Sequence, residues 1–82
     1  MKNKVLVELI IPELEKKYNV YLPINKKIGN IILLLNQAIS DIDENHKRKN
    51  NSLYNRETGF KYTPNTLLFN SDIRNGTALV LI

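Results

Sequence analysis

The sequence predicts a small α+β domain in which a mixed sheet of four to five strands wraps over one main helix. Three observations lead to this prediction. Residues 26–42 space their aliphatic side chains with the period of an α-helix. Most of the other apolar runs alternate with the period of a strand. The chain has 82 residues, which is enough for one core, so the helix and the sheet have to bury their apolar faces against each other.

The first two predicted strands form a hairpin. Residues 4–11, KVLVELII, place one set of aliphatic side chains on a common face: Val5, Val7, Leu9 and Ile11. The opposite face carries Leu6 and Ile10, which a fully solvated face would not need. A polar turn with a proline leads to the second strand at residues 17–24, whose own apolar face is formed by Tyr18, Val20 and Leu22.

The predicted helix, KKIGNIILLLNQAISDI, is amphipathic. Its apolar face is formed by Ile28, Ile31, Ile32, Leu35, Ile39 and Ile42. Polar side chains dominate the opposite side, where Leu33 is an aliphatic exception and a weaker candidate for a second protein contact. Asn25, just upstream, is the expected N-cap.

Shorter elements are expected after the helix. Residues 43–51 are uniformly polar and predict a loop. Two short strands follow at residues 52–56 and 60–62, with Leu53 facing the core and Tyr54 facing solvent. A short helical turn then buries three side chains: Leu67, Leu68 and Ile73. The dipeptide Asn75-Gly76 predicts a tight turn into a last strand at residues 77–82, TALVLI, whose apolar character on both faces suits a central position.

Composition favours a protein that folds alone in the cytoplasm. The chain is 43% hydrophobic and 24% charged, which is ordinary for a globular domain. It contains no cysteine, which excludes disulfides and thiolate metal sites and fits a reducing compartment. No apolar run is long enough for a signal peptide or a membrane span.

The sequence offers little material for catalysis. With one histidine and no cysteine, no nucleophilic triad can be assembled, and the carboxylates are scattered. We therefore expect a protein that is not an enzyme and has no cofactor or metal. His46, beside Asp43 and Glu44, is more simply explained as a solvated loop residue than as a metal ligand.

A basic run supplies the alternative hypothesis. Lys47, Arg48 and Lys49 could bind RNA or another polyanion, in a chain with a net charge of +4. Nearby acidic residues offset this charge, and no aromatic side chains are interleaved to stack on bases, so nucleic acid is a disfavoured partner.

The last third of the chain, TLLFNSDIRNGTALVLI, resembles the end of ubiquitin-like proteins. The matching residues are Thr66, Leu67, Ile73, Asn75, Gly76, Leu79 and Leu81. Upstream, Leu22-Pro23-Ile24, a lysine pair and the apolar helix are similar to the small bacterial EsaB/YukD family. The resemblance covers nearly the whole chain. It implies the ubiquitin-like β-grasp fold, with the strand order ββαββ and a short helical turn before the last strand, as a single domain over residues 1–82.

The resemblance also implies a function. EsaB/YukD proteins are cytosolic accessory components of bacterial type VII (Esx-type) secretion systems and act through protein contacts. Conjugated or sulfur-carrying relatives of ubiquitin need a Gly-Gly tail, and this sequence stops at Ile82, so we expect it to be neither. The implied role is a non-enzymatic adaptor.

The expected binding surface is the sheet face that points away from the helix. Strand alternation places five apolar residues there: Leu6, Ile10, Tyr54, Val80 and Ile82. Ubiquitin binds partners through this same face, and by resemblance Tyr54 and Val80 would lie near the centre of the patch. The expected partner is a protein, either a membrane-embedded secretion component or a second copy of the chain in a homodimer.

Overall fold

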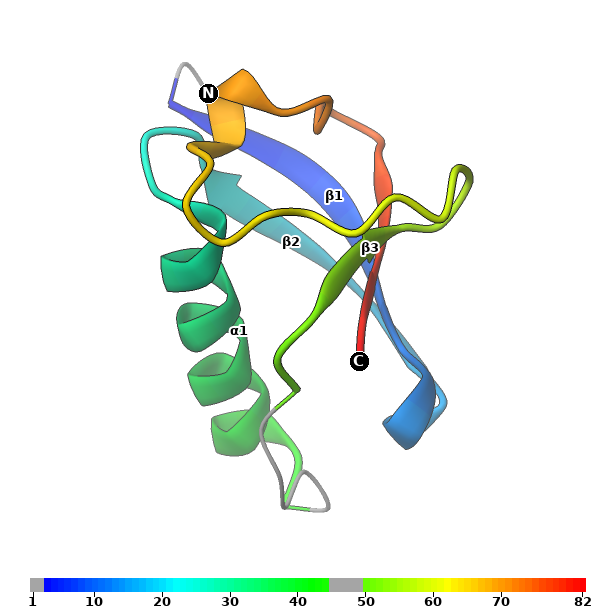
Figure 1. Cartoon of the computed structure of the whole chain (residues 1–82). Helices are drawn as coiled ribbons and strands as arrows, with labels where there is room; N and C mark the ends of the chain where they lie inside the picture. Colours follow the sequence, from blue (N-terminus) through cyan, green and yellow to red (C-terminus); the bar gives the residue numbers. More distant parts are fainter. Residues whose placement is uncertain (1–2, 45–49) are drawn as a thin grey trace.

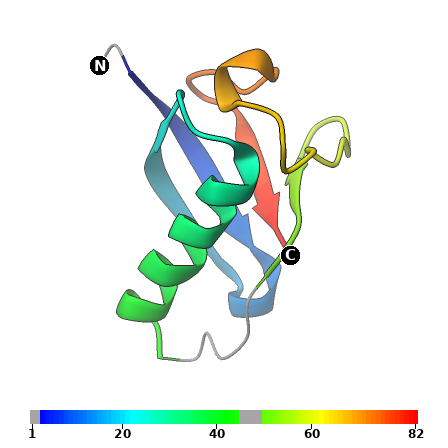
Figure 2. The same ribbon diagram turned by 60° about the vertical axis from the view of Figure 1, so that its left-hand side comes forward.

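The computed structural model describes residues 3–44 and 50–82. One helix lies across one face of a twisted sheet (Figures 1 and 2). The elements in chain order are β1 (Lys4–Ile11), the 3-10 turn η1 (Pro12–Leu14), β2 (Lys16–Pro23), α1 (Ile28–Ile42), β3 (Leu53–Asn55), the 3-10 turn η2 (Leu68–Asn70) and β4 (Ala78–Leu81). This is the predicted α+β order.

The sheet is mixed and has the strand order β2-β1-β4-β3. The β1/β2 and β3/β4 pairs are antiparallel, whereas β1 and β4 run parallel. The last strand is therefore central, as its aliphatic sequence predicts. Leu79 and Leu81 are fully buried between the helix and the neighbouring strands.

The core lies between α1 and the inner face of the sheet. The helix contributes five of its aliphatic residues to it: Ile28, Ile31, Ile32, Leu35 and Ile39. The facing strands contribute side chains at alternate positions: Val7, Leu9, Ile11, Leu22, Leu53, Leu79 and Leu81. Each apolar residue buried here stabilises the fold by about 1.5–3 kcal/mol relative to exposure. The helix period and the strand period thus converge on one core.

The helix begins differently from the prediction. Lys27, not Asn25, is the N-cap residue, and no side chain caps the helix. The backbone carbonyls of a later segment do this instead. The Ile28 amide donates to the Thr66 carbonyl at 2.9 Å, and the Gly29 amide donates to the Pro64 carbonyl at 2.9 Å. An asparagine cap is unnecessary because these carbonyls already accept the free amides of the first turn.

Ile42 is a second departure, because it is 66% exposed rather than buried. The neighbouring Asp43 turns inward in its place. Its carboxylate Oδ2 lies 2.7 Å from the Lys16 ammonium at the start of β2, and its side chain is only 4% exposed. This hydrogen-bonded pair raises the pKa of Lys16. The C-terminal end of α1 is thus tied to β2 by an ion pair.

The second of the short predicted strands is not formed. Residues 60–62 contribute only an isolated bridge between Lys61 and Tyr54. Shortly after it the chain turns to reach the helix N-terminus through Pro64, which ends any further pairing with β3. The sheet therefore has four strands, the lower of the two numbers that the sequence predicts.

A buried asparagine attaches the helix to the segment before β3. Asn36 is 3% exposed, and its side-chain Nδ2 donates to the Asn50 carbonyl at 2.7 Å. Its Oδ1 accepts from the Asn50 amide at 2.9 Å. The side chain thus matches both backbone groups of Asn50, as a neighbouring strand would.

Candidate protein-binding face

The sheet face opposite α1, here called the outer face, carries a row of three apolar side chains from adjacent strands. Ile10 of β1 pairs with Val80 of β4, and Val80 pairs with Tyr54 of β3. Paired residues point to the same side of a sheet and touch their neighbours. All three are half-buried rather than fully exposed. We call Ile10, Val80 and Tyr54 the central row.

A lysine stands at each end of the central row. Lys17 of β2 is the cross-strand partner of Ile10, and Lys61 is the bridge partner of Tyr54. Both lysines are exposed. The outer face therefore presents an apolar centre with a positive charge on each side, which suits a partner surface that is apolar in the middle and carboxylate-bearing at its rim.

The other two predicted residues lie outside the central row. Leu6, 39% exposed, is four positions before Ile10 on β1, a separation of about 13 Å along a strand, and Glu8 stands between them on the same face. Ile82, 55% exposed, lies just past β4 at the opposite end. The structure brings Ile10, Val80 and Tyr54 together and leaves Leu6 and Ile82 on either side of them.

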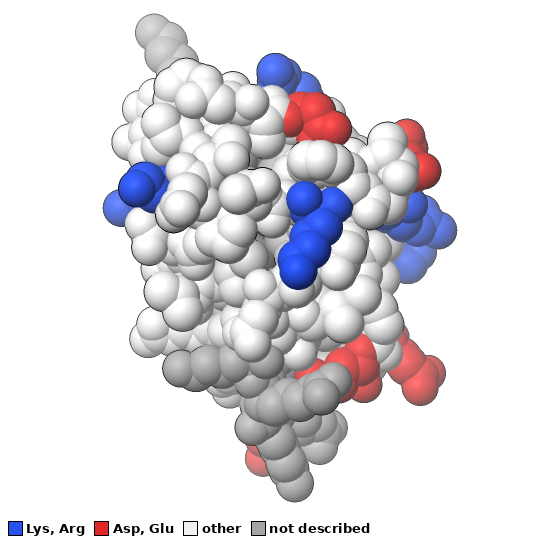
Figure 3. Space-filling model, in the orientation of Figure 1, with Lys and Arg blue, Asp and Glu red and all other residues white. Residues whose placement is uncertain are grey.

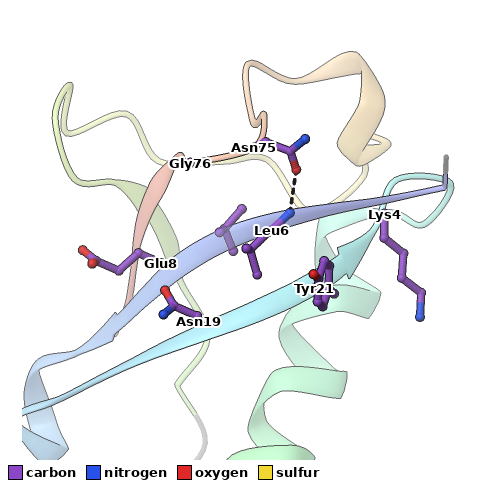
Figure 4. Close-up of a pocket in the computed structure, with 8 residues that line it drawn as sticks. Lys4, Leu6, Glu8, Asn19, Tyr21, Asn75 and Gly76 are labelled. Atoms are coloured by element: carbon purple, nitrogen blue, oxygen red, sulfur yellow. Dashed lines mark hydrogen bonds between the residues drawn. The ribbon is translucent and has the colours of Figure 1, made fainter. Parts of the chain in front are cut away.

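Leu6 belongs instead to an open hollow of about 460 Å³ on the outer face. Figure 4 shows Lys4, Leu6 and Glu8 of β1 beside Asn19 and Tyr21 of β2, under the turn at residues 75–76. The Asn75 side chain closes one end, because its Oδ1 accepts the Leu6 amide at 2.8 Å. Lys4 and Glu8 give the lining both charge signs. It is an uneven surface rather than a pocket built for one small ligand.

Tyr21 is an exposed aromatic residue that is missing from the predicted binding surface. It is 54% exposed and pairs directly with Leu6 across the β1/β2 ladder. The signal was available in the alternation of β2, because Tyr18, Val20 and Leu22 define the inner face, and Tyr21 must therefore point outward.

The alternative basic site cannot be placed. Lys47, Arg48 and Lys49, like His46, lie outside the described residues. Among the coloured residues on the face shown in Figure 3, basic and acidic side chains occupy separate spots and form no continuous patch of one sign. Within residues 3–44 and 50–82, no group of three or more potential ligands is arranged to hold a metal ion.

A titrating group with a strongly raised pKa lies beside β3 and not on the outer face. Tyr62 is 3% exposed, and its hydroxyl donates to Asp72 Oδ1 at 2.5 Å and accepts from Asn55 Nδ2 at 3.1 Å. Burial, reinforced by the hydrogen bond to Asp72, raises the pKa of Tyr62 to about 12. The neutral phenol thus bonds to Asp72 and to Asn55 at once and ties the end of β3 to the segment before β4.

No family model matches the sequence, and no curated protein matches it. Among solved structures, a chain of the MycP5-free ESX-5 inner membrane complex, in its State II, matches with a TM-score of 0.76 and 16% identity. The match covers 98% of the present chain but 21% of that chain, so the present chain corresponds to about a fifth of a longer one.

A second solved structure comes from a plant. The ubiquitin-like domain of the Arabidopsis thaliana protein At2g32350 matches with a TM-score of 0.66 and 16% identity, over 98% of the present chain and 77% of that one. At this identity the likeness shows the fold alone.

Of the helices in the described part of the chain, none combines the length and apolar character needed to cross a bilayer. The chain has a ubiquitin-like β-grasp fold, with one helix packed on a mixed four-stranded sheet.

Proposed function

We propose that this protein is a non-enzymatic ubiquitin-like adaptor that works in the cytoplasm with a bacterial type VII (Esx-type) secretion system. The single observation that supports a binding role is the central row. Three half-buried apolar side chains on adjacent strands face away from the core, between two lysines. Such a surface gains free energy when a partner covers it, whereas scattered exposed aliphatics need no explanation.

The link to secretion rests on fold similarity and on the resemblance to the EsaB/YukD family. A chain of an ESX-5 inner membrane complex contains a region of the same fold, with a TM-score of 0.76. An adaptor with this fold would bind a component of such a membrane complex through Tyr54, Val80 and Ile10. The lysines at the ends of the row would pair with carboxylates of that component.

The proposal is tested by affinity capture from the native host, followed by identification of the captured proteins. The test variant carries Tyr54→Ala with Val80→Asp, which removes the ring and places a charge in the middle of the row. The matched control is Gln37→Asp, because Gln37 is exposed and lies on α1, away from the outer face. Circular dichroism and a urea titration establish that each variant is folded before capture.

We expect the wild type and Gln37→Asp to capture a membrane-associated secretion component, and the double variant to lose it. Capture of the same component by all three proteins would remove the central row from the proposal. The salt dependence addresses the alternative. Binding through phosphate contacts weakens steeply between about 50 and 200 mM salt, whereas binding centred on apolar contacts changes little. Capture of ribonucleoprotein that high salt releases would favour residues 47–49 and overturn the adaptor hypothesis.

A further inference from the structure

One edge of the sheet is open along a whole strand. β2 is the outermost strand and pairs with β1 alone. Two backbone hydrogen bonds show which residues of β1 and β2 bond to each other. The Ile24 amide donates to the Asn3 carbonyl at 3.0 Å, whereas the Glu8 amide points away from β2 and donates to the Thr77 carbonyl. Because bonded pairs alternate in an antiparallel ladder, the odd-numbered residues of β1 bond to the even-numbered residues of β2.

Three residues of β2 therefore direct their backbone N–H and C=O groups away from the sheet. They are Lys17, Asn19 and Tyr21. Within the described part of the chain, these outward groups make no hydrogen bond to another segment. A row of free donors and acceptors at strand spacing is complementary to one kind of structure, another β-strand.

The open edge lacks the usual protection along its central part. Natural edge strands are shielded by charged side chains, prolines or bulges. Here Lys16, Lys17 and Pro23 stand only at the ends of β2. Residues 18–22 between them, YNVYL, carry no charge and no proline, and four of the five are residues that favour strands or apolar surroundings. Among the described residues, no other strand pairs with the outer edge of this stretch.

An exposed apolar stripe runs along the helix on the same side. Leu34, Ala38 and Ile42 follow one another at four-residue intervals, so they lie on one line of α1, and all three are exposed. Asn36 marks the opposite flank of the helix, because it bonds to Asn50 on the β3 side. The stripe therefore lies toward β2.

We propose that the β2 edge pairs with β2 of a second copy of this chain, antiparallel and around a two-fold axis at Asn19. This register satisfies the outward backbone groups of Lys17, Asn19 and Tyr21. Asn19 pairs with Asn19 of the second copy, and Lys17 pairs with Tyr21 of the second copy on each side of the axis. Shifting the axis toward either end brings Pro23, which has no N–H, or Glu15, which has the left-handed φ of 54°, opposite one of these residues.

Side chains fit the same register. On the outer face, the ammonium of Lys17 meets the Tyr21 ring of the second copy, a favourable cation–π neighbour. On the inner face, Tyr18 meets Val20, an aromatic and β-branched pair of the kind that stabilises sheets. No like charges oppose each other across the axis. A second copy is therefore the occupant that the side chains of this edge fit, because each half supplies what the other half needs.

The proposed dimer accounts for two exposed features of the single chain. The central row would continue through Lys17 into Tyr21 and Leu6 of the second copy, giving a longer outer face that remains free for a partner. The stripe of Leu34, Ala38 and Ile42 would approach the same stripe of the second copy. An interface of one strand and one helix stripe is near the lower end of specific interfaces, about 1,200 Å² in total, so we expect a dimer that dissociates on dilution.

The test is the oligomeric state of the full chain, measured by sedimentation equilibrium over a wide concentration range. Asn19→Lys and Asn19→Asp each place like charges at the two-fold axis, and each is expected to weaken dimerisation by about tenfold or more. An equimolar mixture of the two variants places opposite charges there, and we expect it to recover the dimer as a heterodimer. Gln37→Lys adds the same charge at an exposed position of α1 and should leave the dimer intact.

The outcomes separate this proposal from the adaptor hypothesis. A wild type that stays monomeric at millimolar concentration overturns the proposal, as does a dimer that persists in both Asn19 variants. A dimer lost only on Tyr54→Ala with Val80→Asp would assign self-association to the central row and overturn pairing at β2. Recovery in the mixture, after loss in each variant alone, supports the register at Asn19, because it requires an interface in which the two copies of residue 19 lie close together. Partner capture by the central row is measured separately and does not decide this result.

Discussion

The two edge strands of the sheet, β3 and β2, differ in whether another segment covers their outer side. β3 has only three residues, and the chain folds back over its outer side. The Asn55 amide donates to the Phe60 carbonyl, and the Tyr62 amide donates to the Leu53 carbonyl, both at 2.9 Å. β2 is eight residues long, and no described segment returns to cover it. The comparison shows how the β3 edge is protected: residues 60–62 fold back and bond to it, so charged residues along the strand are not needed.

The largest expected effect compares one tyrosine at each edge. Tyr62→Ala removes a buried ring and two hydrogen bonds at the closed edge, and we expect it to lower the free energy of unfolding by about 3–5 kcal/mol. Tyr21→Ala removes an exposed ring at the open edge and should cost less than about 1 kcal/mol. Urea titrations of both variants measure the contrast, and equal losses would contradict it.

A second expected effect concerns the attachment that leads the chain into β3. Asn36→Ala leaves the Asn50 amide and carbonyl without their partner, which we expect to cost about 2–3 kcal/mol. Gln37→Ala, at the exposed neighbouring position, serves as the matched control and should change stability by about 0.5 kcal/mol or less. Thermal unfolding followed by circular dichroism compares the two. A loss no greater for Asn36→Ala than for the control would mean that the closed edge does not depend on this attachment.

The smallest expected effect is a pH dependence of the closed edge. The folded state raises the pKa of Tyr62 from 10.0 to about 12, which means that it favours the neutral phenol. This contribution to stability is complete below about pH 10 and is lost as the pH rises toward 12. We expect the wild type to lose about 1 kcal/mol more than Tyr62→Phe over that range, after allowance for solvent screening. Parallel pH profiles for the wild type and Tyr62→Phe would contradict the prediction.

Sequence periodicity predicted the fold because the elements that carry it are long. Fifteen residues of helix and eight of β1 repeat their pattern often enough to fix which side faces the core. The errors fall where a distant segment decides the outcome. Asn25 does not cap the helix because the Pro64 and Thr66 carbonyls reach the first amides. Ile42 is exposed because Asp43 turns inward to Lys16. Neither contact leaves a local signal in the sequence.

The candidate site was predictable in part for the same reason. Alternation alone assigns Ile10, Tyr54 and Val80 to the outer face, and the structure places them side by side. The register of the strands decides the rest, and register is not encoded in the period. It separates Leu6 from the central row and gives it Tyr21 as a neighbour. The lysines at the ends of the row also follow from register, because Lys17 and Lys61 come from segments far apart in the sequence.

The position of β4 has a consequence for how the protein is made. Residues 78–81 form the strand that stands between β1 and β3, so the sheet cannot close until they have left the ribosome. During synthesis, the β1/β2 hairpin and α1 emerge first, with the β4 side of β1 still bare. A β-rich fold whose first and last strands pair in this way has a high contact order and gains its stability late. The nascent domain is therefore most exposed to proteases and to unwanted strand pairing until residues 78–81 have emerged and paired with β1 and β3.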